Sequence, residues 1–462
     1  MLMKRMIYLL FLAFLMAGCL GSGSKENVTL TKTLTPTPAY TITVKQVPNL
    51  TVTGLHSFVY GKHGNELLII GGRTNGYHGT DASDPSSTFP ASMANDKIRV
   101  INYLTGDEWT ADVPAAVKEQ FTSTNAQFYQ QDNSLFIAGG YGINAQNEHE
   151  TFPTLSAVNV SEMITAVKGG NTAAIASNVT SITDEGFRVT GGEMLKIDDH
   201  YFLVFGQNFV GTYTQATTGV YTNEIREFSI SYDNGSLSAQ LTNTYRDGDL
   251  PDSTTRFHRR DLNVVPQIMG DGSEGIAVYG GVFTQKVNGA FVNPVIIQKE
   301  SGQVKTDILN FEQRMSQYAC ANVTLYDEDS ESMFTTLLGG ISYYHYNAAG
   351  DLVANPEMPW VKTITTYVRK ADGSYEEHIQ GSAYNVSLPK FIGGESKFLA
   401  IDGLAYGDSK EILDFKKAAA ATNGLIGYMF GGIESPKEQS SSLYPTSAIR
   451  NVYEVYLEKT SD

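Results

Sequence analysis

Short apolar segments that end in two adjacent glycines recur along most of the chain. In the clearest copy four consecutive apolar residues precede Gly71 and Gly72. The third copy is weaker, because Gln207 replaces its second glycine. The six copies lie at 66–73, 134–141, 201–207, 275–281, 333–340 and 424–432. Such spacing indicates an internal repeat of one supersecondary unit.

Each copy has the surroundings expected of an antiparallel meander. A short strand and a turn precede it, and a loop and a third strand follow it, as at 97–103, where apolar and polar residues alternate. A glycine pair at the end of a strand lets neighbouring backbones approach and turn, because glycine has no Cβ. The repeated unit therefore predicts one blade of a β-propeller.

The unit resembles the kelch repeat, in which a double glycine ends the second strand of each blade and an aromatic residue and a tryptophan follow. The first copy matches best, with Tyr103 after its third strand and Trp109 leading into the fourth. The other copies keep the glycines without this tryptophan, since Trp360 is the only other one in the chain. The resemblance implies a kelch-like propeller, a fold that serves mostly as an interaction platform.

We expect residues 38–462 to form an all-β, six-bladed kelch-like β-propeller. After the sixth glycine pair the chain supplies a third strand at 448–457 and no fourth. The segment 40–47 alternates like a strand, so we expect this N-terminal strand to close the last blade. Helices are expected at 409–421, which contains no Gly or Pro, and in a smaller form at 161–169.

The first 18 residues are typical of a lipoprotein signal peptide. Two basic residues precede an apolar run, 6–17, that is too short to stay in a bilayer as a span. The run ends in Gly18 and Cys19 and resembles the lipobox of bacterial lipoproteins, which implies acylation of Cys19, with palmitate among the chains. The alternative is an ordinary secretory signal with a chance cysteine. Residues 19–37 are rich in Gly, Ser, Thr and Lys and are expected to form a flexible tether.

These N-terminal features predict a location as well as an anchor. We expect the protein in the cell envelope, held on a membrane through its N-terminal lipid. Leu20 follows Cys19 in place of the acidic residue that commonly retains lipoproteins at the inner membrane. We therefore expect the outer membrane, with the propeller facing the periplasm or the exterior.

Charge and cysteine content narrow the partners and the forces that hold the fold. The formal net charge is -16 at pH 7, whereas binding to nucleic acid requires clustered Lys and Arg. We expect no nucleic acid partner. Only two cysteines occur, so with Cys19 acylated Cys320 has no partner for an intramolecular disulfide.

Candidate ligand-binding residues come first from the innermost strands, which line the central channel of a propeller. These strands start just before each glycine-pair strand. Arg259 and Arg260 favour a carboxylate or another anion, because guanidinium binds it bidentately; the alternative is a salt bridge between blades. The inward candidates are His56, Ser57, Asn125, Gln127, Glu193, His258, Arg259, Arg260, Asp261, Tyr318 and Cys320.

The loops after the glycine pairs supply a second set of candidates. Aromatic faces beside amides suit sugar rings; the alternative is that the tyrosines pack loop on loop. The set contains Arg73, residues 74–78, residues 207–209, Tyr343, Tyr344 and His345.

No cofactor is predicted, and copper is the alternative. His56, His258 and Cys320 lie near predicted inner strands and would suit a soft metal, and galactose oxidase is a copper enzyme with a kelch-type propeller. The spacing shows no ligand pair, however, and the other interpretation of Cys320 is a buried apolar thiol. The chain has no phosphate-cradling glycine loop, metalloprotease helix motif or nucleophile elbow.

Besides a copper-binding propeller, which requires His56, His258 and Cys320 to converge, two functions fit these observations. The first is a non-enzymatic binding or scaffolding module for a protein or glycan. The second is a carbohydrate-active enzyme similar to the sialic-acid mutarotases, in which Arg259 or Arg260 would hold a sugar carboxylate and Glu193 or His258 would carry a proton. The deciding geometry is whether Glu193 and the arginines converge at one mouth of the channel.

Overall fold

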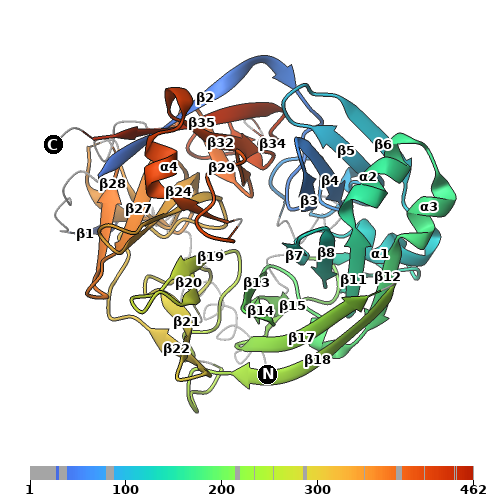
Figure 1. Ribbon diagram of the computed structural model, residues 1–462, viewed down its shortest axis with the longest axis horizontal. Coiled ribbons are helices and arrows are strands. Elements are labelled where there is room, and N and C mark those ends of the chain that lie inside the picture. The colour runs from blue at the N-terminus through green and yellow to red at the C-terminus, as the bar shows by residue number, and fades with distance from the viewer. Residues whose placement is uncertain are drawn as a thin grey trace, which may run out of the picture.

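The computed structural model describes residues 28–30 and 39–460, except 80–87, 214–218, 234, 253, 285–288, 348, 381–387, 410, 442 and 444. Six sheets of four or five strands follow one another around a central axis (Figure 1). Each sheet is formed mainly by consecutive strands, and each is called a blade below. The prediction of an all-β propeller is confirmed.

Blades one to three are regular four-stranded meanders. Blade one contains β3 (Val59–His63), β4 (Glu66–Ile70), β5 (Lys97–Asn102) and β6 (Glu108–Asp112). Blade two contains β7 (Gln127–Gln131), β8 (Ser134–Ala138), β11 (Thr154–Asn159) and β12 (Val179–Thr183). Blade three contains β13 (Glu193–Ile197), β14 (His200–Val204), β17 (Ile225–Asp233) and β18 (Ser236–Tyr245).

Blades four to six complete the circle. Blade four contains β19 (Asn263–Ile268), β20 (Glu274–Tyr279), β21 (Val295–Glu300) and β22 (Gln303–Ile308). Blade five contains β23 (Ala321–Asp327), β24 (Ser332–Ile341), β27 (Trp360–Arg369), β28 (Tyr375–Ile379) and β31 (Ile412–Asp414). Blade six contains β30 (Lys397–Ala400), β32 (Leu425–Phe430), β35 (Asn451–Lys459) and β2 (Tyr40–Thr51).

The N-terminal strand closes the last blade as predicted. β2 pairs antiparallel with β35, with Tyr40 opposite Lys459 and Gln46 opposite Tyr453. Across the next seam, the Gly432 N–H donates to the Leu55 carbonyl of blade one at 2.8 Å. β2 thus covers the edge of β35 that would otherwise be unpaired, and the pairing joins the two ends of the propeller.

Apolar packing between blades holds the ring. Six buried clusters each join two neighbouring blades, and together they include the interface between blades six and one. In that interface Phe58 of blade one packs edge-on against Phe430 of blade six, with ring centroids 5.9 Å apart. The apolar faces of the strands are therefore buried between neighbouring blades. The axis lies outside these apolar interfaces, so the inner strands can carry polar residues there.

The glycine pairs mark a sharp turn that most residues resist. Gly71 and Gly72 both have positive φ, 62° and 85°, and a Cβ on Gly71 would lie 2.5 Å from the Ser123 carbonyl oxygen of blade two. Positive φ in two successive residues is the reason for glycine here. In the weaker third copy, Phe205 takes the first of these positions with φ of 59° and Gly206 takes the second with φ of 90°. The expectation that Gln207 replaces the second glycine is therefore wrong by one residue.

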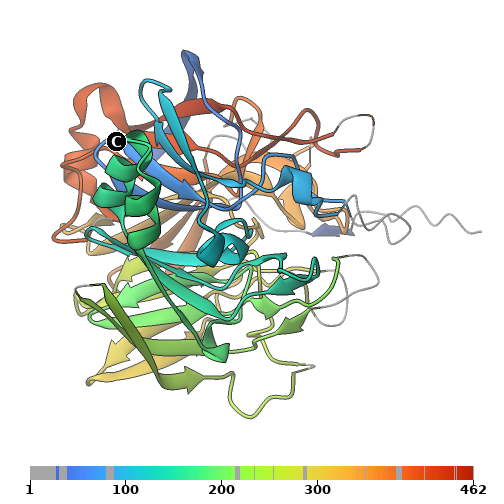
Figure 2. The same cartoon turned by 90° about the vertical axis from the view of Figure 1, so that its right-hand side faces the viewer.

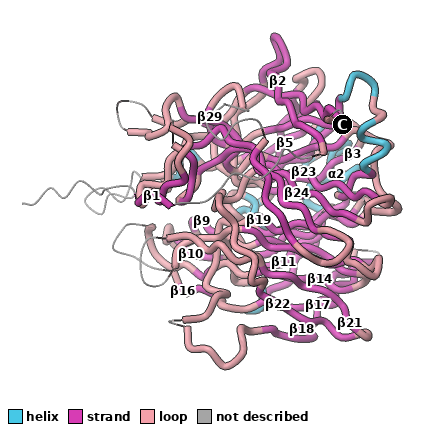
Figure 3. The backbone as a smooth tube through the Cα atoms, turned by 90° about the vertical axis from the view of Figure 1, so that its left-hand side faces the viewer, coloured by secondary structure: helices cyan, strands magenta, loops and turns pink. Residues whose placement is uncertain are grey.

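Small hairpins project on the face where the glycine pairs lie. β9 (Tyr141–Ile143) pairs with β10 (His149–Thr151), and β15 (Gln207–Asn208) pairs with β16 (Val220–Tyr221). β25 (Tyr344–Tyr346) and β26 (Leu352–Ala354) form a sheet with β1 (Val28–Leu30), and β29 (Phe391–Gly394), β33 (Ile433–Ser435) and β34 (Ser447–Ala448) form another. The edge-on views show these additions projecting on one side of the disc, here called the mouth face (Figures 2 and 3).

The helices agree with the sequence in one place and differ in another. α2 (Val160–Lys168) matches the helix expected at 161–169, is capped by the Asn159 side chain, and is followed by α3 (Thr172–Ser177). The single helix expected at 409–421 is wrong: α4 (Phe415–Ala419) is shorter and follows β31. β31 pairs in parallel with β23 and buries Ile412 and Leu413, and this tertiary pairing overrides local helix propensity. A short helix, α1 (Lys118–Phe121), precedes blade two.

The N-terminal predictions fall almost entirely outside the described residues. These are the signal peptide, the lipidation of Cys19 and most of the tether, although β1 lies within the segment expected as tether. None of the helices in the described part of the chain has the length and apolar character that crossing a bilayer requires.

Candidate functional site

A ring of backbone hydrogen bonds surrounds the axis at the level where the inner strands begin. In each blade the ring residue lies two positions before the innermost strand. Five N–H groups, from Asn125 round to Glu395, donate to the carbonyl of the ring residue in the preceding blade, with donor–acceptor distances of 2.8–3.2 Å. Between blades six and one the contact is a hydrogen bond between the Glu395 and Ser57 side chains. The six ring residues are Ser57, Asn125, Gly191, Asp261, Ala319 and Glu395.

The backbone of this ring aims polar side chains at the axis. Four of its non-glycine members have positive φ, between 50° and 57°. Positive φ is uncommon outside glycine and is found most often where function or tight turns require it. These four residues are Ser57, Asn125, Asp261 and Glu395, and each lines both cavities described below. The ring therefore forms a polar floor between the two cavities.

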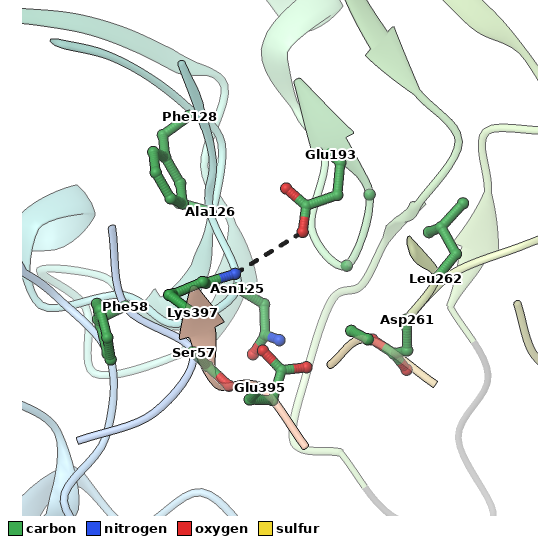
Figure 4. Close-up of a pocket in the computed structure, with 13 residues that line it drawn as sticks. Ser57, Phe58, Asn125, Ala126, Phe128, Glu193, Asp261, Leu262, Glu395 and Lys397 are labelled. Atoms are coloured by element: carbon green, nitrogen blue, oxygen red, sulfur yellow. Dashed lines mark ion pairs between the residues drawn. The ribbon is translucent and has the colours of Figure 1, made fainter. Parts of the chain in front are cut away.

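The smaller cavity lies on the channel side of the ring and has about 360 Å³ of empty space, part of it open to solvent (Figure 4). Lys397 of blade six reaches across the axis to Glu193 of blade three, with Nζ 4.0 Å from Oε1. Phe58 and Phe128 line the same space. Three carboxyl groups face it with one ammonium group, so this part of the channel is electronegative.

Glu395 is the carboxyl group of this floor with the largest change in acidity. Burial raises its pKa to about 7; Lys397 opposes this change, and Asp261 and Glu193 add to it. A hydrogen bond with the Ser57 side chain favours the charged form. Burial also raises the pKa of Asp261 and of Glu193. Near neutral pH Glu395 therefore exchanges a proton readily, as a general acid or base requires.

The larger cavity lies on the mouth side of the ring and has about 960 Å³ of empty space, part of it open to solvent. Aromatic side chains form most of its wall, while Thr190 and Gln207 add to the polar floor. Aromatic walls over a polar floor suit a ring-shaped ligand with an apolar face and a polar edge. The aromatic wall residues are Tyr77, Phe89, Tyr141, Phe209, Tyr213, Phe283, Tyr318 and Trp360.

Arg260 is the cationic side chain of this cavity. Its Nε and Nη2 donate to the hydroxyl groups of Tyr221 and Tyr213, each at 2.9 Å, and its guanidinium also lies 5.3 Å from the centre of the Phe283 ring. Asp261 lies 3.7 Å from Nη1, and the Arg260 side chain is only 12% exposed. The tyrosine hydroxyls hold the fork in place, and Asp261 offsets part of its charge. An anionic ligand would therefore bind the guanidinium in competition with Asp261.

Two predicted site residues support this arrangement from behind. His258 stacks on Tyr221, with ring centroids 3.6 Å apart, and so backs the tyrosine that holds Arg260. Arg73 lies against the Phe89 ring at 5.1 Å and donates to the Pro90 carbonyl, which fixes a wall residue. Neither side chain lines the cavities.

His56 does line the larger cavity. Its Nδ1 lies 3.0 Å from the Ser57 hydroxyl, and burial, with the charge of Arg73, lowers its pKa to about 3. The imidazole is therefore neutral.

Arg259 has a structural role and does not contribute to the site. Arg259 is fully buried and donates to the carbonyls of Arg256, Gly280 and Asn293. It thus braces blade four and does not reach the cavities, so the suggested pairing of both arginines at a ligand is not what the geometry shows.

The side chains after the fifth glycine pair pack against the protein. Tyr343 and Tyr344 pack edge to face at 4.8 Å, and buried His345 lies 3.6 Å from Glu438. None of the three lines the cavities, whereas Tyr318 does.

The three residues weighed for copper do not gather. Cys320 is 6% exposed, its Sγ lies 3.5 Å from the Asn263 side chain, and burial raises the pKa of its thiol to about 12. His56 lines the larger cavity, and His258 stacks on Tyr221. Within the described residues no three His, Cys, Asp or Glu side chains are grouped as metal ligands would be.

Sequence reasoning missed Glu395 and Lys397, because a long insertion separates the inner strand of blade six from its glycine pair. It also missed Trp360 and Tyr213 as wall residues. A usable signal exists in hindsight: the ring residue stands two positions before the inner strand in every blade. The convergence of Glu193 with the arginines is not observed: Glu193 lines the smaller cavity and Arg260 the larger one, and Arg259 lines neither. Glu395 shares the larger cavity with Arg260 instead.

Comparisons with known proteins add little to this geometry. No family model matches the chain, and no curated protein matches it. Among solved structures, "Structure of YjhT" is similar with a TM-score of 0.47 and 9% sequence identity, covering 87% of this chain and 95% of that chain. The propeller assignment given above rests on the sheet order and on the packing between blades.

Proposed function

We propose that this protein is a lipid-anchored binding module of the cell envelope whose propeller takes up a carboxylate-bearing glycan. The supporting observation is Arg260, a partly buried cation held by tyrosine hydroxyls inside an aromatic cavity. In this proposal the guanidinium binds the sugar carboxylate, an aromatic face covers the sugar ring, and the polar floor accepts its hydroxyl protons. Acylated Cys19 holds the module on the membrane.

Isothermal titration calorimetry tests this function. The probes are D-galacturonic acid, D-glucuronic acid and N-acetylneuraminic acid, with D-galactose as the neutral comparison. Arg260→Gln removes a charged hydrogen-bonding group, so we expect about a tenfold to hundredfold loss for the acidic sugars, from about 1.5–3 kcal/mol. Arg256→Gln is the matched control, because Arg256 is half exposed and pairs with Asp247 outside the cavities.

Comparison of a neutral sugar and a peptide with the acidic sugars decides between a glycan and a protein partner. Equal affinity for galactose and galacturonic acid, or an unchanged affinity in Arg260→Gln, would contradict the proposal. A protein partner would have to insert a carboxylate at the same place, so a short aromatic peptide with a free C-terminus is the comparison probe. Binding of that peptide alone favours a scaffolding role.

A second candidate function is catalysis on such a sugar, of the mutarotase kind. It is supported by Glu395, a carboxyl group with a pKa near neutral pH in the same cavity as Arg260. The test is the rate at which separated anomers of the bound sugar interconvert, followed by nuclear magnetic resonance. A faster rate with the wild type that Glu395→Gln abolishes supports an enzyme, and an unchanged rate supports the binding module.

A further inference from the structure

The mouth loops of all six blades contribute to the wall of the larger cavity. One wall residue from each blade, in order around the axis, is Phe89, Tyr141, Phe209, Phe283, Trp360 and Ile433. A groove that holds a polymer along its length needs two open sides. Here every blade presents a bulky side chain instead.

Contacts between neighbouring mouth loops close the first three seams of this wall. Between blades one and two, the His149 ring nitrogen lies 3.3 Å from the Phe89 carbonyl oxygen. Between blades two and three, the Tyr141 hydroxyl donates to the Gly211 carbonyl at 2.7 Å. Between blades three and four, Arg260 donates to the Tyr213 hydroxyl at 2.9 Å.

The remaining three seams are also closed. Phe283 of blade four and Tyr318 of blade five pack edge to face at 6.5 Å. The Trp360 N–H donates to the Glu438 carbonyl of blade six at 2.8 Å. The Tyr77 N–H donates to the Thr446 hydroxyl at 2.6 Å and so joins blade one to blade six. Among the described residues, the mouth loops of every pair of neighbouring blades are therefore in contact.

The floor narrows the channel. The backbone hydrogen bonds of the ring residues surround the axis, and behind them Lys397 and Glu193 reach toward each other from opposite blades. β31 adds a strand on the axis side of β23 in the described part of blade five. A polymer that lay across the cavity or ran through the channel would have to displace these groups.

We infer that the cavity recognises the terminal residue of an acidic glycan chain and not an interior segment. This inference rests on the proposed function. One residue inserts to the floor with its carboxylate on Arg260, and the rest of the chain leaves through the mouth. The amount of protein that a glycan binds therefore depends on its number of chain ends. The affinity for a monosaccharide does not reveal this dependence.

The test compares galacturonic acid, a short oligogalacturonate and long polygalacturonate on the full chain purified in detergent. We expect saturation at one protein per recognised chain end, whatever the chain length. At equal concentration of sugar residues, chains about tenfold longer should show about tenfold weaker apparent affinity. Borohydride reduction of the oligomer then tells which end is bound, because it opens the ring of the reducing-end residue.

Each other outcome has a distinct meaning. Several protein molecules on one long chain, with affinity that does not fall with length, overturn end recognition and leave the proposed function standing. Binding of the monosaccharide without the oligomer also overturns it. Failure of every acidic probe, the monosaccharide included, removes the proposed function itself. The measurement uses the wild-type chain, so no folding defect complicates it.

Discussion

Replacing Glu395 with glutamine tests the electrostatics of the channel floor. The folded state raises the pKa of this carboxyl from 4.5 to about 7, mainly through burial. A tenfold change in a protonation equilibrium corresponds to about 1.4 kcal/mol, so the ionised group opposes folding by up to about 3 kcal/mol above pH 7. Solvent at the partly exposed floor reduces this figure, and about 1–3 kcal/mol is the expected range.

Because folding raises the pKa of Glu395, its ionisation lowers stability only as the pH rises. Below pH 4.5 the carboxyl is protonated in both the folded and the unfolded chain, so its stabilising contribution is fully present. Between pH 4.5 and 7 only the folded chain holds the proton, and stability falls as the pH rises. Glu395→Gln resembles the protonated form at every pH. It should be only slightly more stable than the wild type at pH 5 and clearly more stable at pH 8.

Thermal unfolding of both proteins between pH 5 and pH 8 measures this difference. Ser57→Ala is the companion variant, since it removes the hydrogen bond that favours the charged form and should move the transition of the pH profile upward. A difference between wild type and Glu395→Gln that does not change with pH, or a variant less stable at pH 8, refutes the reasoning.

Three further predictions concern stability and reactivity. Arg259→Met leaves three buried carbonyls without their donor and should lower the free energy of unfolding by about 3 kcal/mol or more in chemical denaturation, against less than about 1 kcal/mol for Lys305→Gln, which breaks an exposed ion pair with Glu300; similar losses would contradict the structural role of Arg259. Cys320 should resist iodoacetamide in the folded chain at pH 8 and react in urea, because burial raises the pKa of its thiol to about 12; rapid labelling of the native protein argues against that burial. Deletion of residues 40–51 exposes the edge of β35 and should abolish a cooperative unfolding transition, and a deletion variant that still unfolds cooperatively would show that closure by β2 is dispensable.

The fold was largely predictable because its signals are local and repeated. The glycine pairs report two consecutive residues with positive φ, and the alternating segments at 40–47 and 97–103 report strands with one face in the core. The helix expected at 409–421 failed for a nonlocal reason. Its first residues gain more by pairing with β23 than their helix propensity offers, and no neighbouring residue signals that pairing.

The site was predictable only in part. Arg260, His56, Glu193 and Tyr318 were found because they stand next to recognisable inner strands. Side-chain direction was not predictable, so Arg259, next to Arg260, was given the same role although it points into blade four. Glu395 escaped because its blade is interrupted by an insertion, and its acidity depends on burial and on groups far away in sequence.

Tryptophan fluorescence gives the most direct test of the central claim, that an acidic sugar binds in the aromatic cavity. Trp360 is 4% exposed and lines that cavity, whereas the other tryptophan, Trp109, lies on the outer strand of blade one beneath Lys168. In a Trp109→Phe background the emission therefore reports on Trp360 alone. We predict that the emission changes and saturates as galacturonic acid is added, and that Arg260→Gln shifts the titration to at least about tenfold higher concentration. Saturable binding in calorimetry with no change in Trp360 emission would place the ligand elsewhere and contradict the account.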